Sequence, residues 1–272
     1  MSGNLPGMDN VMDNVNGKWA LVTGASSGFG IEFATLLAER NANLILAARR
    51  TQPMEELAQQ LRQKHGVQVV VEGIDLSVPG AGTELKARLD ERGIAVDVLV
   101  NNAGFGLFGD FVSQPIQKVL GMLQLNMLAV TELTHLFAAD MVKRRTGHIL
   151  LVASSLGYEA TPGYAAYGAS KGYVLLLGEA LHAELKPHGV NVTVLSPGPA
   201  STSFGHVAGQ KNTAVVRMLM MEPKPIARTG ILAMLRHRSS IIAGVLNKLI
   251  VFSFRFAPRQ MQGRIMQRAL SG

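Results

Sequence analysis

Short apolar runs alternate along this chain with longer segments whose apolar residues recur at helical spacing. The short runs are rich in β-branched and other apolar residues, and they cover 19–23, 43–47, 68–72, 96–100, 148–153, 190–195 and 239–243. Helical periodicity marks 31–40, 54–65, 84–91, 116–141 and a segment that ends near 185. Strands that alternate with helices in this way predict an α/β fold with a doubly wound parallel sheet, whose ligand contacts lie at the carboxyl ends of the strands.

The sequence predicts one large domain over 17–245, because no linker divides the chain. Residues 1–16 predict a flexible leader rich in Gly, Asn, Asp and Met, without the features of a secretory signal. Residues 246–272 predict a basic amphipathic extension. No apolar run reaches the roughly 18 residues that a membrane span needs.

The first strand is followed at once by a glycine-rich turn, Thr23–Gly30, and then by a helix. In this context Gly24 permits a tight turn, Gly28 lets the backbone approach a pyrophosphate, and Gly30 lets helix and strand pack closely. The phosphates would rest on the amino end of the helix, where free N–H groups favour anions. The turn therefore predicts a dinucleotide site, with contacts from Gly24, Ser26, Ser27, Gly28, Phe29 and Gly30.

The second strand ends in Arg49 and Arg50, where an NAD site would usually carry an acid for the ribose 2′-hydroxyl. Two guanidinium groups favour a 2′-phosphate, so the sequence predicts NADP(H) over NAD(H). The alternative is a solvated or helix-capping basic pair. After the third strand, Asp75 and Leu76 could contact an adenine, or Asp75 could simply stabilise a turn.

Small and amide residues follow two further strands, where they suit close contact with a cofactor. These residues are Asn102, Ala103 and Gly104 after the fourth strand, and Pro197, Gly198 and Thr202 after the sixth. Asn126 lies inside the expected helix 116–141, where it either points to solvent or is buried with partners.

Tyr167 is the one tyrosine of four that has a lysine four residues later, Lys171. Such residues share a helix face, and an ammonium beside a phenol lowers a tyrosine pKa. A tyrosine of this kind can donate or accept a proton near neutral pH. Taken alone, the spacing also fits a surface helix.

Taken in order, these motifs resemble the short-chain dehydrogenase/reductase family over roughly residues 17–202. The resemblance implies a single-domain Rossmann fold with strand order 3-2-1-4-5-6-7, helices on both faces, NAD(P) as cofactor and no metal. It implies that Tyr167 is the catalytic acid/base, that Lys171 lowers its pKa and holds the nicotinamide ribose, and that Asn126 positions a water. Ser154 starts an S-x-x-G pattern 13 residues before Tyr167, as the family serine does, whereas Ser155 fits neither feature and is expected to be structural.

The resemblance implies hydride transfer between an alcohol and a carbonyl, and the apolar residues near the motifs predict an apolar ketone or aldehyde. The expected substrate pocket consists of Phe105, Phe108, Ser154, Tyr158, Tyr164 and Phe204. Met218, Met220 and Met221 form either a mobile apolar lid or the core face of an ordinary helix. The alternative function is a dinucleotide-binding sensor or scaffold without catalysis.

Net charge is +7 overall, but all of the excess lies near the C-terminus. After Glu222 the chain has nine basic and no acidic residues, which leaves 17 basic and 19 acidic residues in the first 222 positions. A basic amphipathic segment can bind an anionic membrane, a partner subunit or its own core. We expect a homodimer or homotetramer and no nucleic-acid partner. The expected location is cytoplasmic, with peripheral contact with a membrane surface. There is no cysteine, which excludes disulfides and thiolate chemistry.

Overall fold

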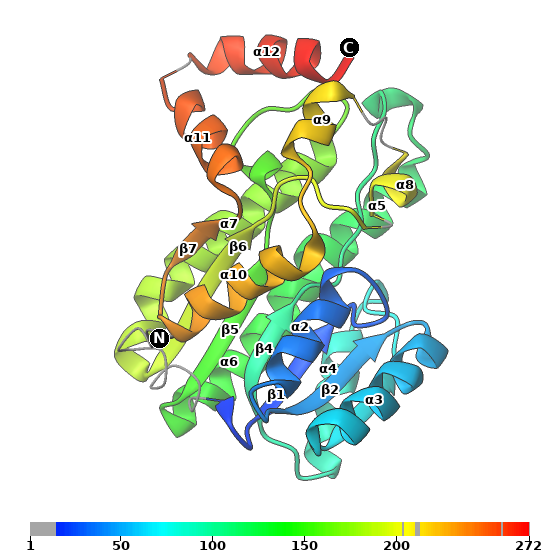
Figure 1. The fold of residues 1–272 in the computed structure, drawn as a ribbon, viewed down its shortest axis with the longest axis vertical. Helices are drawn as coiled ribbons and strands as arrows, with labels where there is room; N and C mark the ends of the chain where they lie inside the picture. The colour runs from blue at the N-terminus through cyan, green and yellow to red at the C-terminus, as the bar shows by residue number, and fades with distance from the viewer. Residues whose placement is uncertain (1–14, 203, 210–212, 257, 272) are drawn as a thin grey trace, which may run out of the picture.

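The described residues of the computed structural model, which are 15–202, 204–209, 213–256 and 258–271, form a seven-stranded parallel sheet with helices on both faces (Figure 1). The strand order is β3-β2-β1-β4-β5-β6-β7, and every neighbouring pair is parallel. This confirms the fold class and the order expected from the family resemblance. Most of the expected leader, 1–14, lies outside the described residues.

The predicted strands are all present, with ends that shift by one or two residues. Their bounds are β1 Trp19–Thr23, β2 Asn43–Ala48, β3 Val69–Gly73, β4 Val96–Asn101, β5 Gly147–Val152, β6 Val190–Ser196 and β7 Ser240–Ile242. The main helices are α2 Phe29–Ala38, α3 Thr51–His65, α4 Ala81–Glu91, α5 Ile116–Leu123, α6 Val130–Arg144, α7 Ala165–Leu185 and α10 Pro223–Leu235. Two short helices, α8 Phe204–Ala208 and α9 Ala214–Leu219, follow β6, and α11 Val245–Phe254 and α12 Arg259–Ser271 end the described chain.

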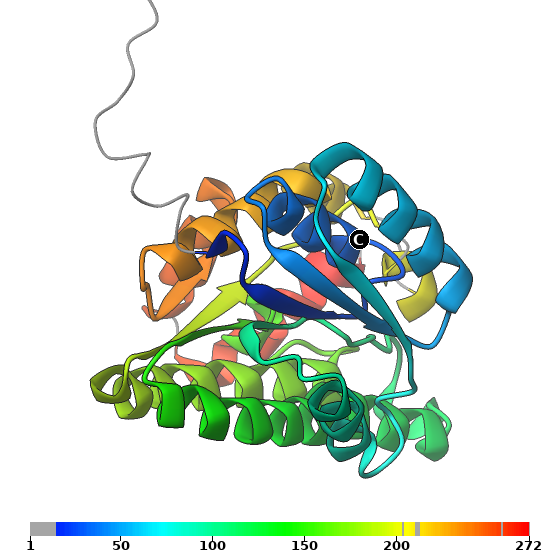
Figure 2. The same ribbon diagram turned by 90° about the horizontal axis from the view of Figure 1, so that it is seen from below.

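Side chains from alternate positions of each strand enter two separate cores, one on each face of the sheet. In β2, for example, Leu44 and Leu46 pack under α2, α3 and α10, whereas Ile45 and Ala47 pack under α4, α6 and α7. Figure 2 shows these two helix layers above and below the sheet. Both faces are covered, which is why the strand sequences are nearly continuous apolar runs.

The prediction of a single continuous helix over 116–141 is wrong in the middle of that range. The structure has α5, then a π-helical segment over Gln124–Ala129, then α6, which continues to Arg144. Asn126, within the π segment, is completely buried. A π turn adds a residue to the helix, and such turns occur often at functional sites.

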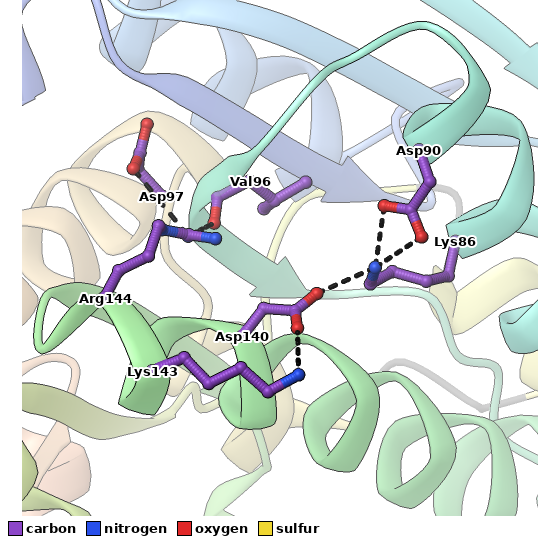
Figure 3. A network of polar contacts seen from close by, with 7 residues as sticks. All are labelled: Lys86, Asp90, Val96, Asp97, Asp140, Lys143 and Arg144. Atoms are coloured by element: carbon purple, nitrogen blue, oxygen red, sulfur yellow. Dashed lines mark hydrogen bonds and ion pairs between the residues drawn. The ribbon is translucent and has the colours of Figure 1, made fainter.

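A polar network joins α4 to α6 near the amino end of β4 (Figure 3). Lys86 Nζ lies 2.6 Å from Asp90 and 2.7 Å from Asp140, and Lys143 forms a further ion pair with Asp140. The Arg144 guanidinium donates to the Val96 carbonyl at 2.7 Å. These contacts lie at the edge of the sheet opposite the sequence motifs, so they stabilise the scaffold away from the candidate site.

None of the helices in the described part of the chain is long and apolar enough to cross a membrane.

Candidate active site

Ser154, Tyr167 and Lys171 come together where β5 ends and α7 begins. Each of the three side chains is at least nine-tenths buried. Ser154 caps a short 3-10 turn and accepts a hydrogen bond from the Leu156 amide at 3.2 Å. This leaves its hydroxyl proton free to bond the Tyr167 oxygen, and that bond partly offsets the effect of burial on the Tyr167 pKa. The choice of Ser154 over Ser155 is consistent with this geometry.

The electrostatics of the pair differ from the expectation of a lowered tyrosine pKa. Burial raises the pKa of Tyr167 to about 12 and lowers the pKa of Lys171 to about 8. The Lys171 ammonium donates to the Val152 carbonyl at 2.8 Å and lies 5.9 Å from the centre of the Tyr167 ring. Burial disfavours each charged form and outweighs this longer-range attraction. At neutral pH, Tyr167 is therefore a neutral phenol and Lys171 is mostly a cation.

Asn126 is fixed by three hydrogen bonds, so the alternative in which it points to solvent is wrong. Its amide oxygen accepts from the Phe105 amide at 3.2 Å, and its amide nitrogen donates to the Phe105 carbonyl at 3.0 Å. The same nitrogen donates to Ser170 Oγ at 3.2 Å, and Ser170 in turn donates to the Tyr167 carbonyl at 2.7 Å. The π segment thus connects to the helix that bears the tyrosine.

An aromatic cluster covers Tyr167. Ring centres lie 5.0 Å apart for Phe108 and Tyr164, 5.7 Å for Tyr164 and Tyr167, and 5.5 Å for Tyr167 and Phe204. Phe105 packs against the same cluster. Four of the expected pocket residues, Phe105, Phe108, Tyr164 and Phe204, therefore lie together around the tyrosine.

Tyr158 lies elsewhere. It packs against the core under α4, α6 and α7. Burial raises the pKa of Tyr158, so it stays a neutral phenol.

The glycine turn has the shape that a pyrophosphate requires. Gly24 and Gly28 have φ angles of 67° and 55°, which favour glycine. A Cβ on Gly30 would lie 2.2 Å from the Gly24 carbonyl oxygen, so the close approach of helix and strand depends on this glycine. The amino end of α2 begins directly after Gly28 and has no side-chain cap. These residues fit a dinucleotide.

Asn102 and Ala103 support the turn from the neighbouring strand. Their amides donate to Thr23 Oγ1 at 3.0 and 2.9 Å, and the Asn102 side chain donates to the Thr23 carbonyl at 2.8 Å. Thr23 was not among the expected site residues. Its role is visible only in the structure, where the carboxyl ends of β1 and β4 lie side by side. Gly104 lies beside Asn126, since a Cβ there would meet its amide oxygen at 2.8 Å.

The two arginines after β2 are exposed and lie beside the glycine turn. Arg50 donates to Ser26 Oγ at 3.3 Å, and Arg49 lies 3.9 Å from Asp75 Oδ2. Asp75 accepts from the amide and hydroxyl of Ser77 at 3.0 and 2.7 Å, so it stabilises a turn, and its contact with an adenine stays a prediction. Leu76 is buried.

The segment after β6 packs against the C-terminal extension. A Cβ on Gly198 would lie 2.4 Å from Asn247 Nδ2, in α11, and the Pro197 carbonyl accepts from the Ser155 amide at 2.8 Å. Thr202 faces the glycine turn, because its methyl group lies 3.5 Å from a Cβ built on Gly28. Asn247 and Ser170 belong to no motif, so neither could be predicted from sequence alone.

The methionines after β6 do not act as one group. Met221 packs on the core under α2, α3 and α10, whereas Met218 is 64% exposed on α9. Met221 therefore packs on the core, as one alternative expected, but from an isolated β-bridge with Ala200 and not from a helix.

Comparisons with known proteins indicate the family and agree with the fold. Residues 18–213 match the family model for short chain dehydrogenases. A very-long-chain 3-oxoacyl-CoA reductase of Pyrenophora tritici-repentis is 32% identical over 216 residues, which are 78% of this chain but only 63% of that protein.

Two solved structures share the fold across most of the chain. A short-chain dehydrogenase from Sphingobium yanoikuyae in complex with NADPH is 30% identical, with a TM-score of 0.78, covering 88% of this chain and 93% of that one. A 7β-hydroxysteroid dehydrogenase is 25% identical, with a TM-score of 0.84, covering 94% of this chain and 99% of that one. With a family model that spans most of its length, a parallel sheet in the expected order and a buried Ser–Tyr–Lys group at the strand ends, this chain belongs to the short-chain dehydrogenase family of oxidoreductases.

Proposed function

We propose that the protein is an NADP(H)-dependent reductase of apolar ketones or aldehydes, able to run in reverse as an alcohol dehydrogenase. The observation that carries the proposal is the neutral Tyr167 phenol, bonded to Ser154 and adjacent to the Lys171 cation within an aromatic cluster. A neutral phenol is the form that can donate a proton to an alkoxide.

Each residue of the group has a separate role in this proposal. Bound NADPH would supply the hydride. The hydroxyls of Ser154 and Tyr167 bind the carbonyl oxygen and stabilise the negative charge that develops on it. Tyr167 then gives its proton to that oxygen, and the Lys171 cation stabilises the phenolate that remains. Asn126 positions this end of α7 through Ser170 and Phe105, and we propose that it also orders a water in the proton relay.

The preference for NADP(H) is supported by charge at the end of β2. Arg50 already contacts Ser26 in the glycine turn, so a 2′-phosphate beside that serine would meet a guanidinium group. The carboxylate of Asp75 accepts hydrogen bonds from Ser77 and lies near Arg49. These partners partly neutralise its charge and reduce its repulsion of a phosphate. One family structure in complex with NADPH agrees with this preference.

We expect Arg50→Ala to weaken NADPH binding by about tenfold to a hundredfold, because charge-assisted hydrogen bonds to phosphate contribute about 1.5 to 3 kcal/mol. NADH binding should stay nearly unchanged, since NADH has no 2′-phosphate. Fluorescence titration with both cofactors measures the two effects. Lys64→Ala, at an exposed position near the far end of α3, is the matched control and should change neither affinity. An equal loss for both cofactors would contradict the 2′-phosphate role.

Two observations support an apolar substrate: the aromatic cluster, and the substrates in the names of two similar proteins. A very-long-chain 3-oxoacyl-CoA and a 7β-hydroxysteroid both contain a large apolar part, the acyl chain and the steroid rings. Phe204 lies on Tyr167 in this structure, and Gly106 leaves room for its ring, since a Cβ there would meet Phe204 at 2.8 Å. We propose that a bulky apolar substrate displaces the Phe204 ring and packs in its place.

The activity is tested by loss of NADPH absorbance with a panel of ketones and aldehydes of increasing apolar size. We expect kcat/KM to rise with the apolar size of the substrate, by about fivefold for each methylene group that becomes buried. No turnover of any member, together with tight NADPH binding, would instead favour a non-catalytic sensor or scaffold.

The homodimer or homotetramer and the cytoplasmic location stay predictions. Leu128, near the start of α6, and Leu176, in α7, are 57% and 70% exposed, and they would supply apolar surface for such an assembly.

A further inference from the structure

Helix α11 has two opposite apolar faces, of which only one packs on the protein. Asn247, Val251 and Phe254 are buried on the inner face. Val245, Leu249 and Phe252 follow at spacings of four and three residues, which places them along one outer face. Phe256 lies two residues beyond the end of the helix, and its ring packs against Phe252 with ring centres 5.4 Å apart. These four side chains are between 51% and 79% exposed. The outer face is therefore a continuous apolar stripe open to solvent, defined here as the α11 stripe.

Cations accompany the α11 stripe. Lys248 and Arg255 are exposed and lie seven residues apart, so they share one flank of the stripe. The Arg255 guanidinium lies 5.8 Å from the centre of the Phe252 ring. A long basic side chain beside an exposed aromatic ring is suited to an interface that is apolar on one side and charged on the other.

Helix α12 extends this surface. Gln262 donates to the Phe254 carbonyl at 2.9 Å, which ties α12 to the end of α11. Met261 and Ile265 are 52% and 43% exposed at a spacing of four residues, with exposed Arg264 beside them. Nine basic and no acidic residues follow Glu222, so no acid of this segment neutralises the cations.

The surface lies at the functional end of the molecule. In Figure 1, α11 and α12 lie at the top, beyond the carboxyl ends of the strands, with α9 beside them. Asn247, on the inner face of α11, packs directly on Gly198 of the candidate cofactor site. A partner bound to the outer face would therefore be close to the entrance of the proposed active site.

We propose that the α11 stripe, with α12, docks on the surface of a membrane that contains anionic lipids. Apolar side chains would enter the boundary between headgroups and acyl chains, while Lys248, Arg255 and Arg264 bind the lipid phosphates. A second copy fits less well, because a two-fold interface brings the same patch of each subunit together and would place like charges opposite each other. The first 222 residues, with 17 basic and 19 acidic side chains, offer little negative charge to attract the segment.

Co-sedimentation with vesicles tests this proposal without any measurement of enzyme activity, so its result is independent of the proposed reaction. The full chain is mixed with vesicles of phosphatidylcholine alone, or with an equal mixture of phosphatidylcholine and phosphatidylglycerol. We expect the protein to pellet only with the mixed vesicles, and binding to weaken as salt is raised.

Two double variants separate the apolar and the ionic contributions. Lys248→Gln with Arg255→Gln should weaken binding about 25-fold, since each cation near an anionic membrane contributes about 1 kcal/mol. Leu249→Ser with Phe252→Ser removes two large apolar side chains from the interface, so we expect a loss of about a hundredfold or more. The matched controls are Lys118→Gln and Leu120→Ser, at exposed positions of α5, and they should bind vesicles as the parent does. Thermal unfolding checks that every variant is folded.

Two results would overturn the proposal. One is equal recovery of the parent protein in the supernatant with both kinds of vesicle. The other is a fall in molar mass by light scattering, without vesicles, for the Leu249→Ser and Phe252→Ser variant alone, which would assign the stripe to contact between copies of the chain.

Discussion

Tyr167→Phe is expected to lower kcat for carbonyl reduction by about a hundredfold to ten-thousandfold, which is the range that one general acid contributes. The substitution removes only the hydroxyl that donates the proton and shares the carbonyl oxygen with Ser154. The ring would keep its contacts with Tyr164 and Phe204, which lie 5.7 and 5.5 Å away. We therefore expect NADPH affinity and thermal stability to change little. Steady-state kinetics and cofactor titration on the same preparation measure both.

Tyr173→Phe is the matched control for this experiment. It lies on the same helix, and its hydroxyl bonds Thr131 at 2.8 Å, away from the aromatic cluster. The control should keep kcat close to that of the parent. If Tyr167→Phe also kept near-normal kcat, the assignment of the proton donor would be wrong.

Local pattern was sufficient to predict most of the fold. The inner strands, such as β1, β2 and β6, are buried on both faces, so each is an apolar run that is visible without the structure. The glycine turn was equally visible, because Gly24 and Gly28 adopt φ angles that few other residues tolerate. What local pattern could not show was the π segment at Asn126, since its cause is a set of partners on distant elements, Phe105 and Ser170.

The spacing of Tyr167 and Lys171 predicted the wrong direction for the Tyr167 pKa, for a related reason. Spacing of four residues placed Lys171 on the same face, but it could not indicate how deeply both groups are buried. Burial decides the direction of both pKa shifts, and it is a property of the whole fold. For the C-terminal extension, the sequence predicted a basic amphipathic segment but not which apolar face of α11 stays exposed, because that depends on how the helix packs.

Lys171→Met is the second change with a large expected effect, and it should move activity and stability in opposite directions. Methionine has a similar unbranched shape but carries no charge, so it cannot stabilise the Tyr167 phenolate or hold the nicotinamide ribose. We expect kcat to fall by about a hundredfold or more. Kinetics at saturating NADPH separate this loss from weaker cofactor binding.

The same variant should be more stable than the parent when no cofactor is bound. Burial lowers the pKa of Lys171 from 10.5 to about 8, so at pH 7 the folded protein holds a buried cation that costs about 3 kcal/mol relative to the unfolded chain. Removing the ammonium leaves the Val152 carbonyl without its partner, which costs about 1 kcal/mol or more. The net gain is therefore about 2 kcal/mol or less, and it should appear as a rise in Tm of a few degrees.

The difference in stability between the parent and Lys171→Met should depend on pH. Between pH 8 and 10.5 the unfolded chain binds the Lys171 proton and the folded protein does not, so the stability of the parent rises with pH in that window relative to the variant. The advantage of Lys171→Met should therefore be greatest at pH 7 and shrink as the pH rises above 8. Thermal unfolding of both proteins across this range, with Lys118→Met as the exposed control, measures the difference. If the variant were less stable than the parent at pH 7, Lys171 would stabilise the fold. That result would contradict the predicted cost of burying its charge.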